Sequence, residues 1–221
     1  MKIYFLLNDI SEFNAQAFCK KYISSHEITY GVVLPENPEH FDLIIPWNYK
    51  KIIKDYKLQN VIIFHSSDLP KGKGWAPIFN VFYKELDEYV ISAILLDEEV
   101  DSGNIIAQAR FKMRNTYTAD FIRKIDDEVT IMMISKILKK MKKKVLKGAK
   151  QDKKQETYYA RRYPEDNELN VNSTLASLVP FLKGCEKSHP SFFYYKGDKF
   201  TISIRPSIPP SMPDDLEITF L

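Results

Sequence analysis

A histidine stands at the end of an apolar run, immediately before a polar turn. Residues 61–76 read VIIFHSSDLPKGKGWA, so a buried strand would deliver His65 to the mouth of a loop rich in Ser, Asp, Pro and Gly. The next apolar run ends in DEEVDSG, whose four carboxylates are Asp97, Glu98, Glu99 and Asp101. A carboxylate beside an imidazole fixes the tautomer of the ring and raises its basicity. The two turns therefore predict a pair that could move a proton.

A second interpretation of the same residues involves no chemistry. In it, His65 caps a turn and the acidic residues are solvated, and the residue pattern alone fits both interpretations equally well. The sequence has no GxGxxG or Walker loop, no HExxH, no CxxC pair and no GxSxG elbow. Dinucleotide, P-loop, zinc and serine-hydrolase functions therefore have no support, and no metal is expected. The His and Asp pair remains the best candidate site.

Length and composition favour one α/β domain with a small appendage. The chain has 221 residues, of which 44% are hydrophobic and 28% charged, as in a folded globular protein. Its formal net charge of +3 is mild, so no nucleic-acid partner is expected. Cys19 and Cys185 are far apart and are expected to be reduced thiols. The start lacks signal-peptide architecture and no apolar run is long enough for a membrane helix, which predicts a cytoplasmic protein.

Apolar runs alternate with helix-like stretches through the first two thirds of the chain. Strands are expected at KIYFLLND, EITYGVVLPE, FDLIIPW, VIIFH and YVISAILLD, with a further strand after the acidic turn. Helices are expected at residues 11–25, 49–56, 74–85 and 118–147. Trp75 begins the apolar stripe of the third helix and is expected in the core. This alternation predicts an α/β fold with a doubly wound, mostly parallel sheet.

A lysine-rich stretch separates this domain from a smaller C-terminal part. Ten lysines fall within residues 136–154, without the interleaved aromatic residues that stack on nucleic-acid bases. We interpret the stretch as the solvated end of a helix followed by a linker. Beyond it, residues 172–185 are helix-like, and SFFYYKGDKFTI has the pattern of a β-hairpin. The predicted organisation is a catalytic domain over residues 1–150 and a C-terminal extension over residues 151–221.

Two motifs resemble a known enzyme family. The segments HSSDLPKGKGWAPI and LLDEEVDSGNIIAQ look like the core of the formyltransferases that use 10-formyltetrahydrofolate. In that family a strand-end His precedes an S-x-L-P loop and a Gly-rich turn, and a D-E-x-x-D-x-G loop follows. The segment ETYYARRYPEDNELN and the hairpin are similar to the sugar-directed branch. The S-D-L-P-K-G-K-G-W loop looks most like the pseudaminic-acid type, which acts on an amino sugar carried by a nucleotide diphosphate such as UDP.

The resemblance implies transfer of a formyl group from 10-formyltetrahydrofolate to the amine of such a sugar. It assigns oxyanion stabilisation and proton transfer to His65, and the orientation of that ring to Asp101. The family's Asn two residues before the His is Ile63 here, which removes one hydrogen-bond donor. Loss of one oxyanion donor costs about 2.7–4 kcal/mol in other enzymes. A protonated His65 is the favoured substitute, ahead of the hydroxyls of Ser66 or Ser67 or a water held by Asp101.

The resemblance also assigns binding residues. The folate is expected against the acidic loop and nearby apolar residues: Leu69, Leu96, Asp97, Glu98, Glu99, Val100 and Asp101. The nucleotide-linked sugar is expected to contact Ser66, Ser67, Lys73, Gly74, Trp75, Tyr159, Arg161 and Arg162. The two arginines would clamp phosphate with help from the lysine, and an aromatic ring would stack on the base. Pro70, Gly72 and Gly74 either let the loop approach a ligand closely or form an ordinary tight turn.

Three other functions stay open at this point. Methionyl-tRNA formyltransferases resemble this chain but are longer and carry a basic C-terminal domain that grips tRNA. A hydrolase of formyltetrahydrofolate would use the same His and Asp to activate water. A non-catalytic protein that binds folate or a nucleotide sugar is made conceivable by Ile63. The aromatic C-terminal region also offers a surface for homodimer formation.

Overall fold

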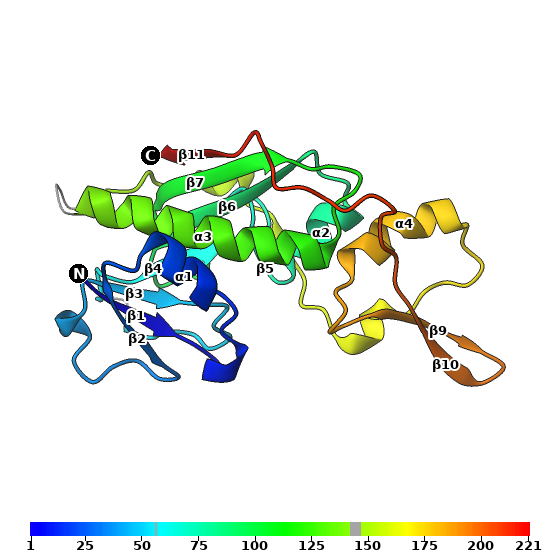
Figure 1. The fold of residues 1–221 in the computed structure, drawn as a ribbon, viewed down its shortest axis with the longest axis horizontal. Coiled ribbons are helices and arrows are strands. Elements are labelled where there is room, and N and C mark those ends of the chain that lie inside the picture. The colour runs from blue at the N-terminus through cyan, green and yellow to red at the C-terminus, as the bar shows by residue number, and fades with distance from the viewer. Residues whose placement is uncertain (56, 142–146) are drawn as a thin grey trace.

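The amino-terminal half of the fold is a three-stranded parallel sheet. A computed structural model describes residues 1–55, 57–141 and 147–221 (Figure 1). The strands lie in the order β2-β1-β3, and α1 connects the first two along the chain. These elements are β1 (Lys2–Leu6), α1 (Gln16–Tyr22), β2 (Glu27–Gly31) and β3 (Leu43–Pro46). A parallel bridge between Ile44 and Val61 joins β3 to the next strand, β4 (Ile62–His65).

The second half of the sheet is antiparallel. Its order is β11-β7-β6-β4, and all three pairings in it are antiparallel. The strands after β4 are β6 (Glu88–Leu95), β7 (Ile105–Lys112) and β11 (Glu217–Phe220). The connection from β6 to β7 is the short acidic turn, which is too short for the crossover that parallel neighbours need. The α/β class and the small hairpin sheet are confirmed. Within the main sheet, parallel pairing is confined to the strands of the amino-terminal half.

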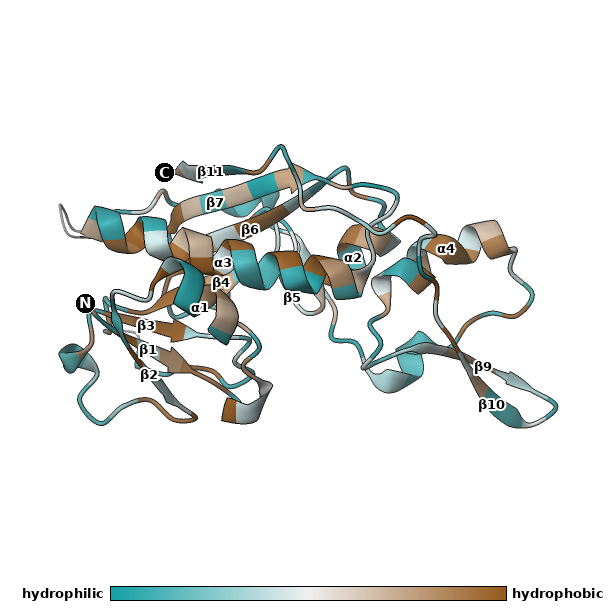
Figure 2. Ribbon diagram, viewed as in Figure 1, coloured by the Kyte–Doolittle hydropathy of each residue, from teal (hydrophilic) through white to brown (hydrophobic). Residues whose placement is uncertain are grey.

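Alternate residues of the strands face two separate apolar clusters. On β1, Ile3 and Phe5 lie in the main core, whereas Tyr4 and Leu6 lie in a cluster on the opposite face. On β4, Ile62 belongs to the main core, and the next residue along the strand packs on the opposite face. Figure 2 shows hydrophobic residues concentrated on these central strands. The period of two therefore decides which side chains of β4 face the helices and which face away.

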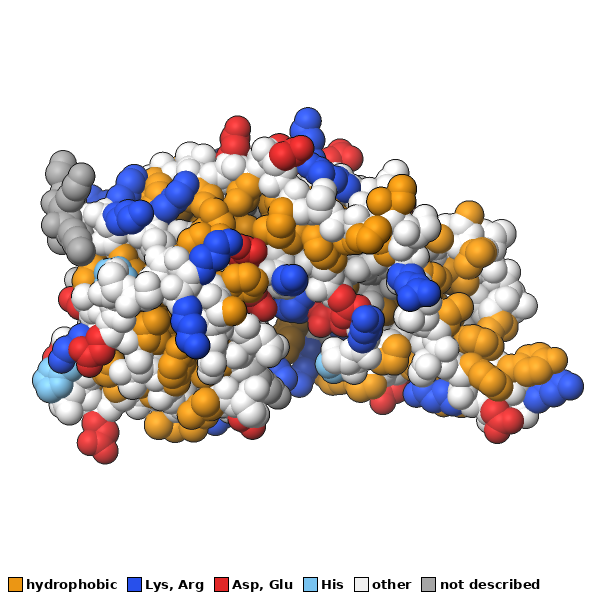
Figure 3. Space-filling model, in the orientation of Figure 1, with side chains coloured by type: hydrophobic (Ala, Val, Ile, Leu, Met, Phe, Trp, Pro, Cys, Tyr) orange, Lys and Arg blue, Asp and Glu red, His pale blue; other side chains and the backbone are white. Residues whose placement is uncertain are grey.

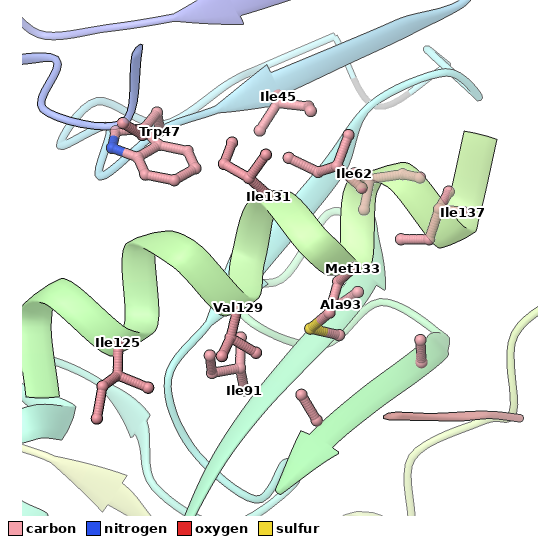
Figure 4. Close-up of a cluster of buried hydrophobic side chains, with 14 of the residues drawn as sticks. Ile45, Trp47, Ile62, Ile91, Ala93, Ile125, Val129, Ile131, Met133 and Ile137 are labelled. Carbon is pink, nitrogen blue, oxygen red and sulfur yellow. The ribbon is translucent and has the colours of Figure 1, made fainter. Parts of the chain in front are cut away.

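Helix α3 (Ala119–Met141) fills the main core between the two halves of the sheet. Figure 4 shows Ile131 near Ile45 and Trp47 on one side, and Val129 and Met133 near the β6 side chains on the other. Most of the expected apolar stripe is buried, with Phe121, Met132 and Met141 only partly so. Because sheet residues contact the helix on two sides, its apolar surface is wider than one stripe. Residues 142–146 of the expected helix and lysine run lie outside the described residues.

Several expectations for the helices are wrong. Residues 49–55 form no helix, because Ile53 is drawn into the cluster on the far face of the sheet. The first helix begins at Gln16 rather than Ser11, after a 3-10 turn that Asp9 caps. Helix α2 (Pro77–Tyr83) begins after Trp75, whose side chain is not in the core but 43% exposed. No helix among the described residues is long and apolar enough to cross a membrane.

The C-terminal residues form a small attachment and then return to the main sheet. Its elements are β8 (Tyr158–Tyr159), α4 (Leu175–Gly184), β9 (Ser191–Tyr195) and β10 (Asp198–Ile202). β8 pairs with β5 (Lys73–Gly74), and β9 and β10 form the expected hairpin, which projects from the body (Figure 1). Figure 3 shows hydrophobic side chains on the surface at this end of the molecule. The rings of Tyr194, Tyr195 and Phe200 on the hairpin are exposed. The last strand, β11, lies against β7.

Replacing Ile131 with Ala should destabilise the fold strongly. The side chain is fully buried between the helix and the parallel strands, and comparable truncations cost about 2–5 kcal/mol. The matched control is Ile52→Ala, since Ile52 is 65% exposed. Urea unfolding measures both, and an Ile131→Ala variant no less stable than the control would contradict this account of the core.

Candidate active site

His65 and Asp101 lie together, as the sequence indicated. The His65 Nδ1 is 3.6 Å from the Asp101 Oδ1, and each side chain is 10% exposed. β4 and β6 are antiparallel, so the carboxyl ends of the two strands that precede these residues do not lie side by side. The pair meets instead because residues 66–74 lead back along the sheet, placing Gly72 against His65 and Gly74 against Asp101.

The hydrogen bond of the imidazole defines which of its edges is available. His65 Nε2 lies 2.8 Å from the carbonyl oxygen of Gly72. A carbonyl oxygen can only accept, so Nε2 carries a proton in this contact. Nδ1 faces the Asp101 carboxylate at a distance longer than a hydrogen bond. An imidazolium suits both contacts, and its Nδ1 edge is the one that a reacting group could approach.

Asp101 is fixed through both its side chain and its backbone. Its Oδ2 accepts a hydrogen bond of 2.9 Å from the amide of Gly74. The Gln151 Nε2 donates to the carbonyl oxygens of Asp101 and Gly103, each at 2.8 Å. Asp101 itself has a left-handed backbone with φ of 56°. The carboxylate is therefore held from two directions before any ligand arrives.

Gly74 is required where it stands. Its φ is 93°, and a Cβ at this position would lie 2.7 Å from the carbonyl oxygen of Tyr159. The adjacent strand β8 pairs with β5 here, and the Tyr159 ring lies beside Gly72 in the same way. Gly72 and Gly74 form a tight turn packed against Tyr159, and the approach of this loop to a ligand stays a prediction. Burial raises the pKa of the Tyr159 hydroxyl.

Lys73 is an internal side chain. It is fully buried, and its Nζ donates to Glu156 Oε1 at 2.7 Å and to Ser102 Oγ at 2.9 Å. The hydrogen bond from Lys73 lowers the pKa of the Glu156 carboxyl. A lysine in this pair ties the loop after β4 to the Asp101 loop and to the segment before β8. Its expected approach to a phosphate would require breaking these contacts.

The start of the loop after β4 is held by side chains on both faces of the sheet. Ser66 Oγ donates to Asp126 Oδ1 on α3 at 2.9 Å. On the other face, Ser92 Oγ of β6 donates to the Ser67 carbonyl at 2.7 Å. The Ser67 hydroxyl donates to the carbonyl of Lys71. Both serine hydroxyls expected near the substrate therefore have protein acceptors.

The residues expected to meet folate divide between an apolar floor and an exposed loop. Leu69 is buried with Ile94 and Ile105, and Ile63 packs against them. Leu96 is partly buried in the neighbouring cluster. The loop side chains before the reactive carboxylate are all exposed: Asp97, Glu98, Glu99 and Val100. Ile63 thus lies on the same face as His65 and gives this side of the site an apolar surface.

The two arginines expected to clamp phosphate point to different places. The Arg161 guanidinium carbon lies 4.6 Å from the centre of the Trp75 ring and 5.3 Å from that of Tyr163. All three side chains are exposed, and they form what we call the Trp75 stack. The Arg162 guanidinium instead lies 3.4 Å over Phe79 and donates to Asn167 Oδ1. Burial lowers the pKa of Arg162, and only Arg161 is presented to a ligand.

The sequence reasoning missed the residues that hold the site in place. Gln108 of β7 donates to Ser92 Oγ and to Asp68, and Gln151 holds the backbone around Asp101. Thr157 Oγ1 accepts from the amide of Gly72 at 2.8 Å. Ser92 was detectable as a polar residue in an otherwise apolar run. Gln151 gave no signal, since it lies among the lysines of the linker.

Buried acids on α3 lie behind the site. Asp126 accepts from Tyr89 Oη at 2.9 Å as well as from Ser66, and burial raises its pKa against the opposing effect of Arg123. Burial and the neighbouring Asp126 raise the pKa of Asp127 to about 7. Arg123 is paired with Glu186 at 2.7 Å. Three carboxyl groups and one guanidinium thus share the space between α3, α4 and the end of β4.

Two cavities lie apart from the His65 and Asp101 pair. One of about 350 Å³ is bounded by the start of α3, the end of α4 and residues 202–205. The other, of about 340 Å³, lies beside α1 and β2. Neither is lined by a residue of the pair. No group of three or more His, Cys, Asp or Glu in the described ranges is arranged to hold a metal ion.

An α/β fold that holds an imidazole against a carboxylate beside an apolar floor has the groups that proton-coupled group transfer or hydrolysis uses. The sequence profile described as formyl transferase matches residues 20–137, which is more than half of the chain. The chain belongs to the formyl transferase family of enzymes.

One relative of known name and one solved structure illustrate what the chain is similar to. A methionyl-tRNA formyltransferase of Fusobacterium nucleatum is 28% identical over 160 residues, covering 71% of this chain and 52% of that protein. The chain therefore spans about half the length of that relative. A solved methionyl-tRNA formyltransferase from Clostridium thermocellum covers 100% of this chain and 99% of its own, with a TM-score of 0.76 and 22% identity.

A sugar-directed enzyme has the same fold. The N-formyltransferase from Helicobacter canadensis, solved with folinic acid and dTDP-3-aminofucose, has a TM-score of 0.69 and 15% identity. The match covers 89% of this chain and 85% of that one. At this identity the likeness concerns the fold, and the acceptor of this chain has to be argued from its own residues.

Asp127 should make the fold less stable as the pH rises. Its pKa in the folded chain is about 7, above the value of 3.8 for an ordinary Asp, so the folded state keeps a proton that the unfolded state has lost. Stability therefore falls between about pH 4 and pH 7 by up to about 4 kcal/mol. Urea unfolding across this range should show Asp127→Asn gaining stability relative to wild type as the pH rises, and a pH-independent difference would contradict the burial argument.

Proposed function

We propose that this enzyme moves the formyl group of 10-formyltetrahydrofolate to the amine of a nucleotide-linked amino sugar. The observation that carries the proposal is the His65 and Asp101 pair over an apolar floor, in a chain of the formyl transferase family. The sugar as acceptor rests on the Trp75 stack and on the resemblance of the residues around Arg161 to the sugar-directed branch. A UDP-linked 4-amino-4,6-dideoxy sugar is the acceptor we favour.

The chemistry asks the site to handle one charge and one proton. As the acceptor nitrogen bonds to the formyl carbon, negative charge gathers on the formyl oxygen, and the Nδ1 edge of a protonated His65 can stabilise it. The bond from that carbon to the folate nitrogen then breaks. His65 gives its proton to the departing nitrogen and regains one from the acceptor nitrogen, which balances the reaction. Asp101 keeps the ring oriented.

Contacts around residue 63 bear on which group donates to the oxyanion, because Ile63 stands where the resembling family has an Asn. Ile63 packs against apolar neighbours and has no polar atom to offer. The hydroxyl proton of Ser66 is directed to Asp126, and that of Ser67 to the carbonyl of Lys71. Each hydroxyl has a single proton, so using either would cost an existing hydrogen bond. These contacts support His65 as the donor.

The binding surfaces follow from what is exposed near the pair. The backbone of residues 97–100 and the apolar floor around Leu69 suit a flat ring with donor and acceptor edges. The Trp75 stack suits a nucleotide, because Trp75 and Tyr163 offer aromatic faces and Arg161 offers a phosphate-binding fork. A structural neighbour solved with folinic acid and dTDP-3-aminofucose supports the combination of these two ligand classes.

A mass-spectrometric assay tests the proposal. The enzyme is incubated with 10-formyltetrahydrofolate and, in separate arms, UDP- and dTDP-linked amino sugars, methionyl-tRNA, or no acceptor. Gain of one formyl group on an amino sugar is expected. The tRNA arm is included because curated relatives carry that activity in their names. Formylation of tRNA alone, formate release alone, or binding without turnover would each overturn the proposal.

Removing either member of the pair should abolish transfer without unfolding the chain. His65→Ala and Asp101→Ala are each expected to lower kcat at least about 10²-fold, the usual contribution of a positioned proton-transfer group. His40→Ala is the control, because that histidine is exposed. Initial rates of sugar formylation measure the effect, and near-normal turnover in either variant would remove the assignment.

Removing the aromatic face of the Trp75 stack should weaken acceptor binding more than catalysis. Base stacking contributes about 1–3 kcal/mol, so Trp75→Ala is expected to raise KM for the nucleotide sugar about tenfold. The KM for the folate donor and kcat should change little, since the ring does not contact the pair. Tyr194→Ala removes an equally exposed ring on the hairpin and is the control. An unchanged KM in Trp75→Ala would place the nucleotide elsewhere.

A further inference from the structure

Asp126 is a buried carboxylate to which the reaction assigns no task. It is 7% exposed on α3, beside apolar core residues and the charged side chains of Arg123 and Asp127. Burying such a group is costly unless its hydrogen bonds compensate. Its two hydrogen bonds, from Ser66 and from Tyr89, both fall on Oδ1 at 2.9 Å. An apolar side chain would fill this place more cheaply, so the carboxylate has to be explained by what it holds.

The place that it holds is the point where β4 leaves the sheet. His65 is the last residue of β4 and pairs with Ser92 of β6. Beyond this pairing, the ladder no longer holds the backbone of Ser66, although β6 extends in that direction as far as Glu88. Asp126 binds Ser66 and Tyr89 together and so replaces the missing ladder contact. On the opposite face, Ser92 holds the carbonyl of the next residue.

The hydrogen bond between Ser66 and Asp126 affects the catalytic ring because Ser66 directly follows His65 along the chain. His65 faces the same side as Ile63, away from α3, whereas Ser66 faces α3. Asp126 therefore holds Ser66 from the face opposite to the imidazole, although the charge of the His65 ring still lowers the pKa of Asp126. A rotation of the backbone at Ser66 would nevertheless turn His65 relative to Asp101. A misplacement of 1 Å by a residue remote from the reaction can cost about 10²-fold in rate.

We infer that Asp126 is a positioning residue, which fixes the end of β4 through Ser66 and thereby sets the His65 ring against Asp101. The inference rests on the proposed role of His65 in formyl transfer. The groups that act on Asp126 are Ser66 and His65 from the β4 end, Tyr89 from β6, and Arg123 and Asp127 from α3. Among them Ser66 both binds Asp126 and adjoins the catalytic ring, and Ser66→Ala removes this bond while it leaves the charge of Asp126 in place.

The test separates hydrogen bonding from burial at this position. Asp126→Leu and Ser66→Ala each remove the contact and are expected to lower kcat at least about tenfold with KM values nearly unchanged. Asp126→Asn keeps a side-chain oxygen that can accept and should retain kcat within about threefold. Glu128→Leu is the matched control on the same helix, because Glu128 is bound by Lys21 and Tyr22 away from β4.

A second readout does not depend on activity. The NMR signal of the His65 ring proton on Cε1 should shift in Asp126→Leu and Ser66→Ala and stay in place in Glu128→Leu. If Asp126→Leu does not fold, Ser66→Ala decides by itself. Unchanged kcat and ring signal in Ser66→Ala, or equal losses in Glu128→Leu, would overturn the inference. If the wild-type enzyme forms no formylated sugar, the proposed function fails, while the ring signal still decides the role of Asp126.

Discussion

The two oxygens of the Asp101 carboxylate connect the two loops of the site. One faces His65 and the other accepts from the amide of Gly74. The carbonyl of Gly72 binds the other edge of the same imidazole. The loop after β4 and the loop after β6 therefore enclose the ring and are joined to each other. The hydrogen bonds of Lys73, Gln151, Thr157, Ser66 and Ser92 each stabilise one of these two loops.

The need to hold these two loops accounts for the polar side chains that are buried next to the apolar core. Lys73 and Glu156 tie both loops to the segment before β8, and Gln151 holds the carbonyl of Asp101. Each buried polar group is costly unless it is paired, and the hydrogen bonds that pair these groups hold the loops around the ring in one geometry. The raised pKa of Asp127 indicates the same cost. Apolar burial between the sheet and α3 stabilises the fold and offsets the cost of these buried polar groups.

Local patterns allowed the central pair and most strands to be predicted. A strand-end His followed by a Gly-rich turn, and an acidic turn after the next strand, made His65 and Asp101 candidates, and the resemblance to the formyltransferases selected them. The limits of α2 were not visible in the periodicity. Ala76 adopts a left-handed backbone and Pro77 occupies the first helical turn, so the helix starts later than the apolar spacing suggests and Trp75 stays exposed. The alternation of strands and helices predicted a mostly parallel sheet. The connection between β6 and β7 is too short for a parallel crossover, so these two strands pair antiparallel.

Residues that act through tertiary contacts escaped prediction for a different reason. Gln151 and Thr157 lie in a polar linker, and their partners Asp101 and Gly72 are distant in sequence. Nothing in the spacing of such residues distinguishes them from solvated ones. Arg161 and Arg162 are neighbours in sequence, yet their side chains lie in different surroundings. Arg162 packs over Phe79 and Phe181, whereas Arg161 lies over the exposed ring of Trp75.

The central claim is that His65 and Asp101 act as one unit, and a double-mutant cycle on kcat tests it most directly. Residues that act together lose their contribution when either is removed. The account predicts that the variant carrying both His65→Ala and Asp101→Ala is about as slow as the slower single variant. Losses that multiply in the double variant would show that the two side chains act independently, and would contradict the account.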